Sequence, residues 1–349
     1  MSSPRPRSGN CRPDHGYGAG VDLPTPCLVV DQGALLHNIA TITETLPSGR
    51  LRPHVKAFKC TGLARLLADA GHRKFTCATV REAEGMAAAG LGEDLLIANE
   101  ILDRQQLARI VAIDGTVTLA VDSEEAIDRA ARAGVARVLI DVEVGLPRCG
   151  CDPAEAGRLA ERARRRGMEV RGVMGYEGHL MMVQDRAERI ARVQRSMERL
   201  LIAAEEVGGE IVSAGGTGTF DTNAWANEIQ AGTFLLGDTH YAALDLPFAQ
   251  AIFIETMVVS ASPKGWLVVN AGLKAHGMDH GNPTWPDGEL LFCSDEHATL
   301  RRGDSTLVPG ERTRLIPAHL DPTVAKHERL YIVDGSTVLE EMAIDLRHW

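Results

Sequence analysis

The sequence predicts an α/β protein in which a (β/α)8 barrel of the TIM type precedes a small antiparallel β domain. The first observation is that short apolar stretches alternate with amphipathic helical patterns from Leu23 to Pro247. The second is that short β-branched runs, separated by Gly, Pro and Asp, replace the helical patterns after Pro247. A chain of 349 residues is long enough for one large domain and a smaller one.

Eight apolar stretches supply the predicted barrel strands, and amphipathic patterns such as Glu82–Ala89, Glu155–Arg166 and Arg186–Val207 lie between them. An open, doubly wound sheet is the competing fold, but its G-x-G-x-x-G fingerprint does not follow the first strand. The strands are predicted to end near Lys56, Ala78, Asn99, Val121, Asp141, Gly175, Gly215 and Gly237.

Composition divides the chain into three parts. Residues 1–22 are rich in Pro, Arg, Gly and Ser without an apolar core, which predicts a disordered arm. Residues 23–247 form the predicted barrel, and residues 248–349 form the β domain. A short strand at residues 27–31 precedes the barrel, and the sequence leaves open whether it belongs to the β domain.

Charge and cysteine content exclude several classes of function. The net charge of -10 argues against a nucleic-acid or anionic-membrane partner. We find no apolar run of membrane length and no hydrophobic region of a signal peptide. The seven cysteines are scattered and include no C-x-x-C pair, which is typical of reduced thiols in a cytoplasmic protein.

A lysine closes the stretch Arg52-Pro53-His54-Val55-Lys56, where the first barrel strand is predicted to end. In a parallel barrel the carboxyl ends of the strands form the active face. A lysine that its neighbours desolvate there can be neutral and nucleophilic. Taken alone, the stretch is equally compatible with a surface lysine at a strand end.

Glycine and threonine lie at the ends of the last two predicted strands, in Ala214-Gly215-Gly216-Thr217-Gly218-Thr219 and in Ala231-Gly232-Thr233. Loops of this composition expose successive backbone N–H groups that can hold a phosphate. Many barrels bind phosphate between the loops that follow strands seven and eight. A nucleophilic lysine opposite a phosphate site fits pyridoxal phosphate held as a Schiff base.

Two further strand ends carry polar residues. Arg148 follows the strand that ends at Asp141, where its guanidinium can hydrogen-bond a ligand oxyanion. The run Gly175-Tyr176-Glu177-Gly178-His179 places two glycines around polar side chains, which predicts close backbone approach to a ligand. A helix-capping arginine and a tight turn with a packed tyrosine are the structural alternatives.

The β domain contributes His319-Leu320-Asp321. On an extended segment, positions two apart point to the same face. An imidazole and a carboxylate on one face can bind a divalent metal and leave coordination sites open for substrate. Pro317 and Pro322 around this pair predict a fixed, irregular segment.

Together and in this order, the motifs resemble the D-threonine aldolase and D-serine dehydratase family of pyridoxal phosphate enzymes, which has the alanine racemase fold. The resemblance extends from Leu23 to the carboxyl end. It implies that Lys56 carries the cofactor, that Arg148 contacts its phenolic oxygen and that Tyr176 lies near its ring. It assigns the phosphate to the glycine and threonine loops, through Gly216, Thr217, Gly218, Gly232 and Thr233.

The resemblance also implies that His319 and Asp321 bind the metal. Dehydratase members tend to carry Cys at the position of Asp321, so the carboxylate favours the aldolase branch with Mn²⁺ or Mg²⁺, and Zn²⁺ and Co²⁺ are further candidates. Phe58 departs from the family, because many members have His there; we therefore expect no polar role at this position.

The implied activity is cleavage of a D-3-hydroxy amino acid, of the D-threonine or 3-hydroxy-D-aspartate type, to glycine and an aldehyde. His179 is the candidate general base, with a base supplied by the metal as the alternative. A D-serine or 3-hydroxyaspartate dehydratase, an amino-acid racemase and a non-catalytic carrier of the cofactor remain as rival functions. The resemblance further implies a homodimer.

Overall fold

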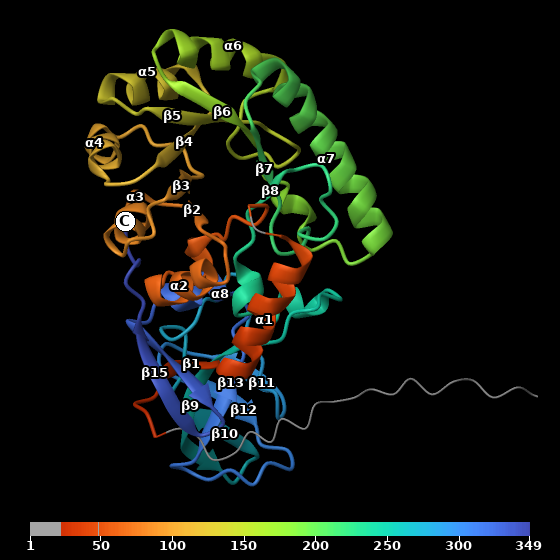
Figure 1. The fold of residues 1–349 in the computed structure, drawn as a ribbon. Coiled ribbons are helices and arrows are strands. Elements are labelled where there is room, and N and C mark those ends of the chain that lie inside the picture. Colours follow the sequence, from red (N-terminus) through yellow and green to blue (C-terminus); the bar gives the residue numbers. More distant parts are fainter. Residues whose placement is uncertain (1–21, 48) are drawn as a thin grey trace, which may run out of the picture.

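A computed structural model describes residues 22–47 and 49–349, so the predicted arm at residues 1–22 lies outside the described residues except for Asp22. Figure 1 shows two parts, with a parallel barrel above and a sheet-rich domain below. The predicted fold class is confirmed: a curved parallel sheet forms the first part, and a largely antiparallel sheet forms the second.

Seven parallel strands form the barrel, and each strand pairs with the next along the chain. Residues 51–54 close the barrel at the position of an eighth strand, because Leu51 bridges to Ile229 on one side and His54 bridges to Thr76 on the other. The strands are β2 (Lys74–Cys77), β3 (Asp94–Ile97), β4 (Val117–Val121), β5 (Arg137–Asp141), β6 (Glu169–Met174), β7 (Ile211–Ala214) and β8 (Glu228–Ile229).

Helices cover the outside of the barrel strands (Figure 1). Short polar side chains cap most of them: Thr79 forms a capping box with Glu82, and Asp152 caps the helix whose first residue is Pro153. Such caps fix where the loops that lead into these helices end. The helices are α2 (Thr61–Asp69), α3 (Val80–Ala88), α4 (Arg104–Ala112), α5 (Glu124–Ala133), α6 (Pro153–Arg165) and α7 (Arg186–Val207).

The second sheet takes its first strand from the beginning of the chain. β1 (Cys27–Asp31) pairs parallel with β14 (Arg329–Asp334) and antiparallel with β9 (Ile252–Ser262), and α1 (Gln32–Thr45) then leads into the barrel. The short helix α8 (Leu320–Ala325) lies between β13 and β14. The remaining strands are β9 (Ile252–Ser262), β10 (Trp266–Val269), β11 (Leu290–Cys293), β12 (Ala298–Arg301), β13 (Arg312–Leu315), β14 (Arg329–Asp334) and β15 (Thr337–Ala343).

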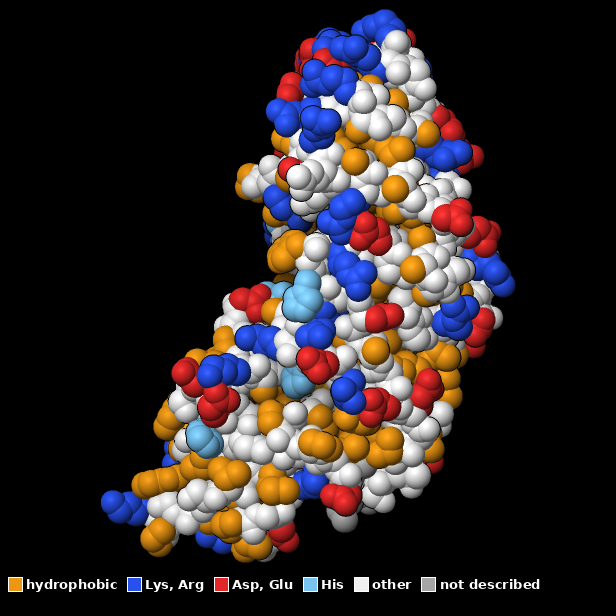
Figure 2. Space-filling model, turned by 90° about the vertical axis from the view of Figure 1, so that its left-hand side faces the viewer, with side chains coloured by type: hydrophobic (Ala, Val, Ile, Leu, Met, Phe, Trp, Pro, Cys, Tyr) orange, Lys and Arg blue, Asp and Glu red, His pale blue; other side chains and the backbone are white. Residues whose placement is uncertain are grey.

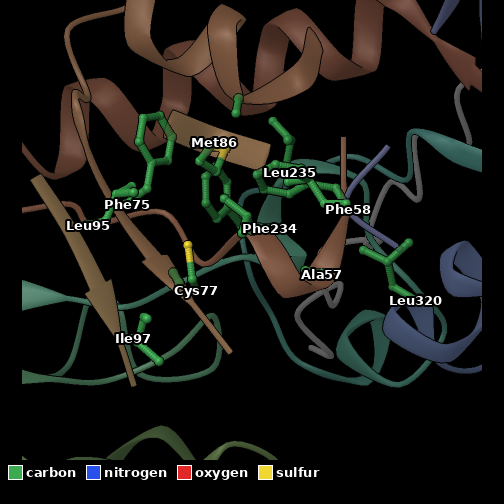
Figure 3. Close-up of a cluster of buried hydrophobic side chains, with 14 of the residues drawn as sticks. Ala57, Phe58, Phe75, Cys77, Met86, Leu95, Ile97, Phe234, Leu235 and Leu320 are labelled. Atoms are coloured by element: carbon green, nitrogen blue, oxygen red, sulfur yellow. The ribbon is translucent and has the colours of Figure 1, made fainter. Parts of the chain in front are cut away.

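The two residues that follow the predicted reactive lysine belong to the hydrophobic core. Ala57 and Phe58, which follow Lys56, lie beside Phe234 and Leu320 in Figure 3, and all four are buried. Burying an aromatic side chain removes a large apolar area from water. Phe58 is thus a core residue, and it anchors the turn from which the lysine projects.

Charged side chains close the opposite end of the barrel. The buried guanidinium of Arg52 contacts Glu228 at 2.9 Å and Asp94 at 3.2 Å, and Arg171 approaches Asp94 at 2.9 Å. Although burial acts to raise it, the pKa of Asp94 falls to about 2, because both guanidinium groups hydrogen-bond its carboxylate. This end of the barrel is therefore fixed by paired charges.

Three local predictions were wrong. Residues 51–56 form only bridges, and Lys56 lies in a 3-10 turn, Val55–Ala57. The eighth strand ends at Ile229 rather than near Gly237, because the apolar run that suggested a strand forms a buried 3-10 turn, Thr233–Leu235. His319 and Asp321 lie at the start of α8 and not on an extended segment.

No helix among the described residues is long and apolar enough to cross a membrane. The cysteines in this part of the chain are free thiols. Figure 2 shows Lys and Arg side chains crowded at the end of the molecule where Figure 1 places α5 and α6. Ion pairs offset part of the positive charge at this end, since Arg158 contacts Glu124 and Arg162 contacts Asp128.

Candidate active site

A cavity of about 240 Å³ opens at the carboxyl ends of the barrel strands. Side chains from loops far apart in the sequence line it, among them Lys56, Arg148 and Tyr176. Gly216, Thr217, Gly232 and Thr233 also line it. The structure thus brings together seven of the residues that the sequence proposed as cofactor contacts.

Lys56 projects into this cavity from its buried turn. Its side chain is 46% exposed, and Nζ lies 3.0 Å from Oδ1 of Asp321. The charge of Asp321 raises the pKa of Lys56. Burial acts to raise the pKa of Asp321, but the charges of Lys56 and His319 outweigh burial and hold that pKa below its usual range.

A buried carboxylate holds the first glycine and threonine loop. Glu177 accepts hydrogen bonds from the backbone N–H of Gly215 at 3.0 Å, from Thr219 Oγ1 at 3.0 Å and from Asn223 Nδ2 at 2.9 Å. Burial raises the pKa of Glu177 in spite of these donors. Gly215 adopts φ +80°, which favours glycine. Glu177 therefore determines the shape of the loop.

The two predicted phosphate loops contact each other. Thr217 Oγ1 accepts a hydrogen bond from the backbone N–H of Phe234 at 3.0 Å. Among the described residues, no acceptor pairs with the backbone N–H groups of Thr217 and Thr233. Buried backbone donors are almost always satisfied, so these two groups at the cavity wall fit an anionic ligand such as phosphate. Gly218 does not line the cavity, and an added Cβ would lie 2.2 Å from the backbone oxygen of Met181.

Arg148 and Tyr176 lie on one side of the cavity. The guanidinium carbon lies 5.3 Å from the centre of the tyrosine ring, within the range of a cation–π contact. Burial raises the pKa of Tyr176. The loop that carries Arg148 turns at Gly150, where φ is +108° and a Cβ would meet the backbone nitrogen of Glu143 at 2.6 Å. Glycine at position 150 is thus required for this loop.

His319 and Asp321 approach each other where α8 begins. Nε2 of His319 lies 3.8 Å from Oδ2 of Asp321. Metal–ligand distances of about 2.0–2.2 Å allow one ion to bridge atoms this far apart. Asp238 fixes the start of α8, because its Oδ2 accepts a hydrogen bond from the backbone N–H of Leu320 at 3.0 Å. The donor set of one imidazole and one carboxylate therefore fits a divalent metal.

His179 does not line this cavity. It lines a separate hollow of about 210 Å³ with Arg192 and Arg195, and its ring packs against Gly145. Burial and the charge of Arg192 lower the pKa of His179. The position of His179 beside a glycine predicted contact with a ligand, but the 3-10 turn Gly178–Leu180 directs it toward α7.

Sequence patterns did not assign roles to three groups at the site. Glu177 lies in the predicted ligand-binding run Gly175–His179, but its role in holding the glycine and threonine loop depends on contacts with distant residues such as Asn223. Asp279 and His280 contact His319 across forty residues, and an Asp-His pair beside a glycine is too common to indicate this. His54 is half-buried and lines the cavity, and its buried Nδ1 has no hydrogen-bond partner among the described residues.

Two family models together match most of the chain. Residues 30–240 match the family model "Alanine racemase, N-terminal domain", and residues 251–333 match "Putative serine dehydratase domain". The 3-hydroxy-D-aspartate aldolase of Paracoccus denitrificans is 30% identical over 90% of this chain and 92% of its own length. The D-threonine aldolase of an Arthrobacter species is 30% identical over 93% and 92% of the two chains.

A solved structure extends the similarity to the whole fold. The D-threonine aldolase of Filomicrobium marinum superposes with a TM-score of 0.88 at 29% identity, covering 94% of this chain and 98% of that one. Both parts of the present chain are therefore matched in a single relative. The protein belongs to the family of alanine racemase-fold proteins that includes D-threonine aldolase and 3-hydroxy-D-aspartate aldolase.

Proposed function

We propose that the protein is a lyase, dependent on pyridoxal phosphate and a divalent metal, that cleaves D-3-hydroxy amino acids to glycine and an aldehyde. The two relatives described above are named for this type of reaction. One observation carries the proposal: the Lys56 amine lies 3.0 Å from Asp321, half of the candidate metal pair. A covalent cofactor site and a metal site would therefore act on neighbouring atoms of one substrate.

The residues of the cavity fit pyridoxal phosphate. Lys56 would hold it covalently, the unpaired N–H groups of Thr217 and Thr233 would bind its phosphate, and Arg148 would donate to its phenolic oxygen. Gly216 and Gly232 would allow the backbone to approach, and Tyr176 would flank the ring. The bound cofactor supplies electron withdrawal from Cα of the substrate.

His319 and Asp321 would hold the divalent metal, which lowers the pKa of a substrate hydroxyl that it binds. Asp321 then has two tasks, because it faces Lys56 with one oxygen and His319 with the other. Through these two contacts the carboxylate would link the residue that holds the cofactor to the residue that holds the metal. We assign Mn²⁺ or Mg²⁺ to the site, since a carboxylate is a hard ligand.

Residues of the chain would position the substrate and transfer a proton to it. Lys56 would hold the cofactor, and its amine, fixed beside Asp321, could return a proton to Cα of a bound substrate. The core under Ala57 and Phe58 keeps that amine in place. The proposal gives His179 no part in proton transfer, because it does not line the cavity.

Product analysis tests this function and its rival. A panel of D-threonine, D-phenylserine and 3-hydroxy-D-aspartate would be incubated with the holoenzyme and Mn²⁺. Glycine and an aldehyde are expected, with activity lost in EDTA. Keto acid and ammonia would instead establish a dehydratase. This rival is tested because residues 251–333 match a putative serine dehydratase domain. Inversion at Cα that survives EDTA would establish a racemase.

We also propose a cytoplasmic homodimer that takes a small-molecule substrate, on the strength of the family resemblance and of the free thiols among the described residues. Multi-angle light scattering on the purified protein measures the assembly. A mass equal to a single 37.6 kDa chain would contradict the dimer.

A further inference from the structure

We propose that Asp279 is a positioning residue for the metal site, which holds the His319 ring so that Nε2 faces Asp321 and the metal. The inference rests on the proposed metal-dependent function. Oδ2 of Asp279 lies 2.5 Å from Nδ1 of His319, on the side of the ring away from Asp321. The other ring nitrogen, Nε2, lies 3.8 Å from Oδ2 of Asp321. One imidazole therefore lies between two carboxylates.

The chemistry of imidazole makes this arrangement directional. A neutral histidine has one N–H donor and one lone pair, and the partner of the donor determines which nitrogen carries the proton. A carboxylate can only accept, so Asp279 selects the tautomer with hydrogen on Nδ1. The lone pair then lies on Nε2, toward Asp321. Carboxylates in this position also increase the basicity of a metal-binding histidine.

The loop that carries Asp279 is fastened on both sides of it to the segment that carries His319. Before Asp279, the backbone N–H of Gly277 donates to Thr323 Oγ1 at 3.0 Å, and that hydroxyl donates to the backbone oxygen of His319 at 2.7 Å. After Asp279, Thr284 and Ile316 exchange two backbone hydrogen bonds of 2.9 and 2.8 Å. The contact between Asp279 and His319 is thus built into the fold.

His280 fixes the ring in a second direction. Its imidazole stacks on that of His319 with ring centres 4.0 Å apart and an angle of 9° between the planes. Asp279 therefore fixes one edge of the His319 ring and His280 covers one face. Rotation of His319 about its side-chain bonds would break the hydrogen bond and the stacking together.

Mn²⁺ affinity measures the effect of this restraint. Free Mn²⁺ would be followed by electron paramagnetic resonance in titrations of the cofactor-loaded protein. We expect Asp279→Ala to weaken binding about 10- to 100-fold, and Asp279→Glu to restore much of the loss. Asp287→Ala is the matched control, because Asp287 lies in the same connection between β10 and β11 and its exposed side chain forms neither a hydrogen bond nor an ion pair with His319. Equal affinity in Asp279→Ala and Asp287→Ala would overturn the proposal.

The titration also separates a positioning residue from a ligand. Asp321→Asn should weaken Mn²⁺ binding at least as much as Asp279→Ala does. Unchanged binding in Asp321→Asn combined with complete loss in Asp279→Ala would make Asp279 a ligand and overturn the assignment. Equal melting temperatures of wild type and Asp279→Ala in EDTA are expected, since the loop anchors at Gly277 and Thr284 remain.

The tautomer of His319 provides a readout that needs no metal. Two-bond ¹H–¹⁵N correlation spectra in EDTA, assigned with His319→Asn, should show hydrogen on Nδ1 in the wild type and a mixture in Asp279→Ala. Hydrogen on Nε2 in the wild type would contradict the proposal. If the wild type bound no Mn²⁺, the proposed metal-dependent function would fail, while the tautomer would still decide the role of Asp279.

Discussion

The Nζ atom of Lys56 lies 3.0 Å from Oδ1 of Asp321, and this ion pair joins the first loop of the barrel to α8 of the second domain. Each residue depends on its own domain for support. Ala57 and Phe58 bury the turn that carries the lysine, and Asp238 holds the start of the helix that carries the aspartate. The two domains thus meet at the pair of atoms on which the proposed chemistry depends.

Lys56→Ala should abolish covalent attachment of the cofactor, because the variant lacks the only amine at the cavity wall among the described residues. After incubation with pyridoxal phosphate and borohydride, intact-protein mass spectrometry should show the added mass on the wild type and not on the variant. Lys59→Ala is the control, since Lys59 is paired with Glu82 and does not line the cavity. A stable adduct on Lys56→Ala would remove the basis of the proposed function.

Glu177→Gln should weaken pyridoxal phosphate binding and destabilise the protein by about 1–3 kcal/mol, since an amide cannot accept from all three donors that the carboxylate satisfies. The N–H group of the new amide would also point at a donor. Fluorescence titration with pyridoxal phosphate and urea unfolding measure the two effects. Glu205→Gln, at an exposed position of α7, should change neither. Normal affinity in Glu177→Gln would show that the loop keeps its shape without the carboxylate.

Asp94→Asn should reduce the free energy of unfolding at neutral pH by about 2 kcal/mol. The pKa of Asp94 is lowered to about 2 in the folded protein from an ordinary value of 3.8, and one pKa unit corresponds to about 1.4 kcal/mol. Because the folded pKa is the lower one, this stabilisation is present above about pH 4 and is lost as the pH falls toward 2. Urea unfolding at pH 7, 5 and 3 checks it. A difference between wild type and variant that grows as the pH falls would contradict the assignment.

The sequence predicted the parts of this protein that depend on local patterns. Strands alternating with helices identified the barrel, and the ends of β4 and β5 were placed at Val121 and Asp141, where the structure has them. The glycine and threonine loops were recognised because backbone exposure follows from composition. Relationships between loops could not be predicted in this way. Asp279 and His319 are forty residues apart, and they are brought together by the pairing of Thr284 with Ile316 and by the hydrogen bond from Gly277 to Thr323.

Side-chain direction was the second feature that patterns could not supply. His179 and Lys56 both lie at or just after predicted strand ends, but the turn at Gly178 directs His179 to a different hollow. His319 and Asp321 were predicted on an extended segment, where alternation would place them on one face. In the structure the helix start brings them together instead, with His319 as the residue before α8 and Asp321 in its first turn. His319 and Asp321 are thus close together as predicted, but through a different backbone conformation.

Asp321→Cys should shift the metal preference of the site toward Zn²⁺. A thiolate is a softer ligand than a carboxylate, so it favours Zn²⁺ over Mn²⁺ while His319 is unchanged. Binding titrations with both ions on the cofactor-loaded protein should show a ratio of Mn²⁺ to Zn²⁺ dissociation constants well above that of the wild type. His319→Ala should weaken binding of both ions without this change of ratio, because the carboxylate of Asp321 remains. An identical ratio in Asp321→Cys and wild type would mean that Asp321 does not bind the metal, and that its contact with Lys56 is its whole function.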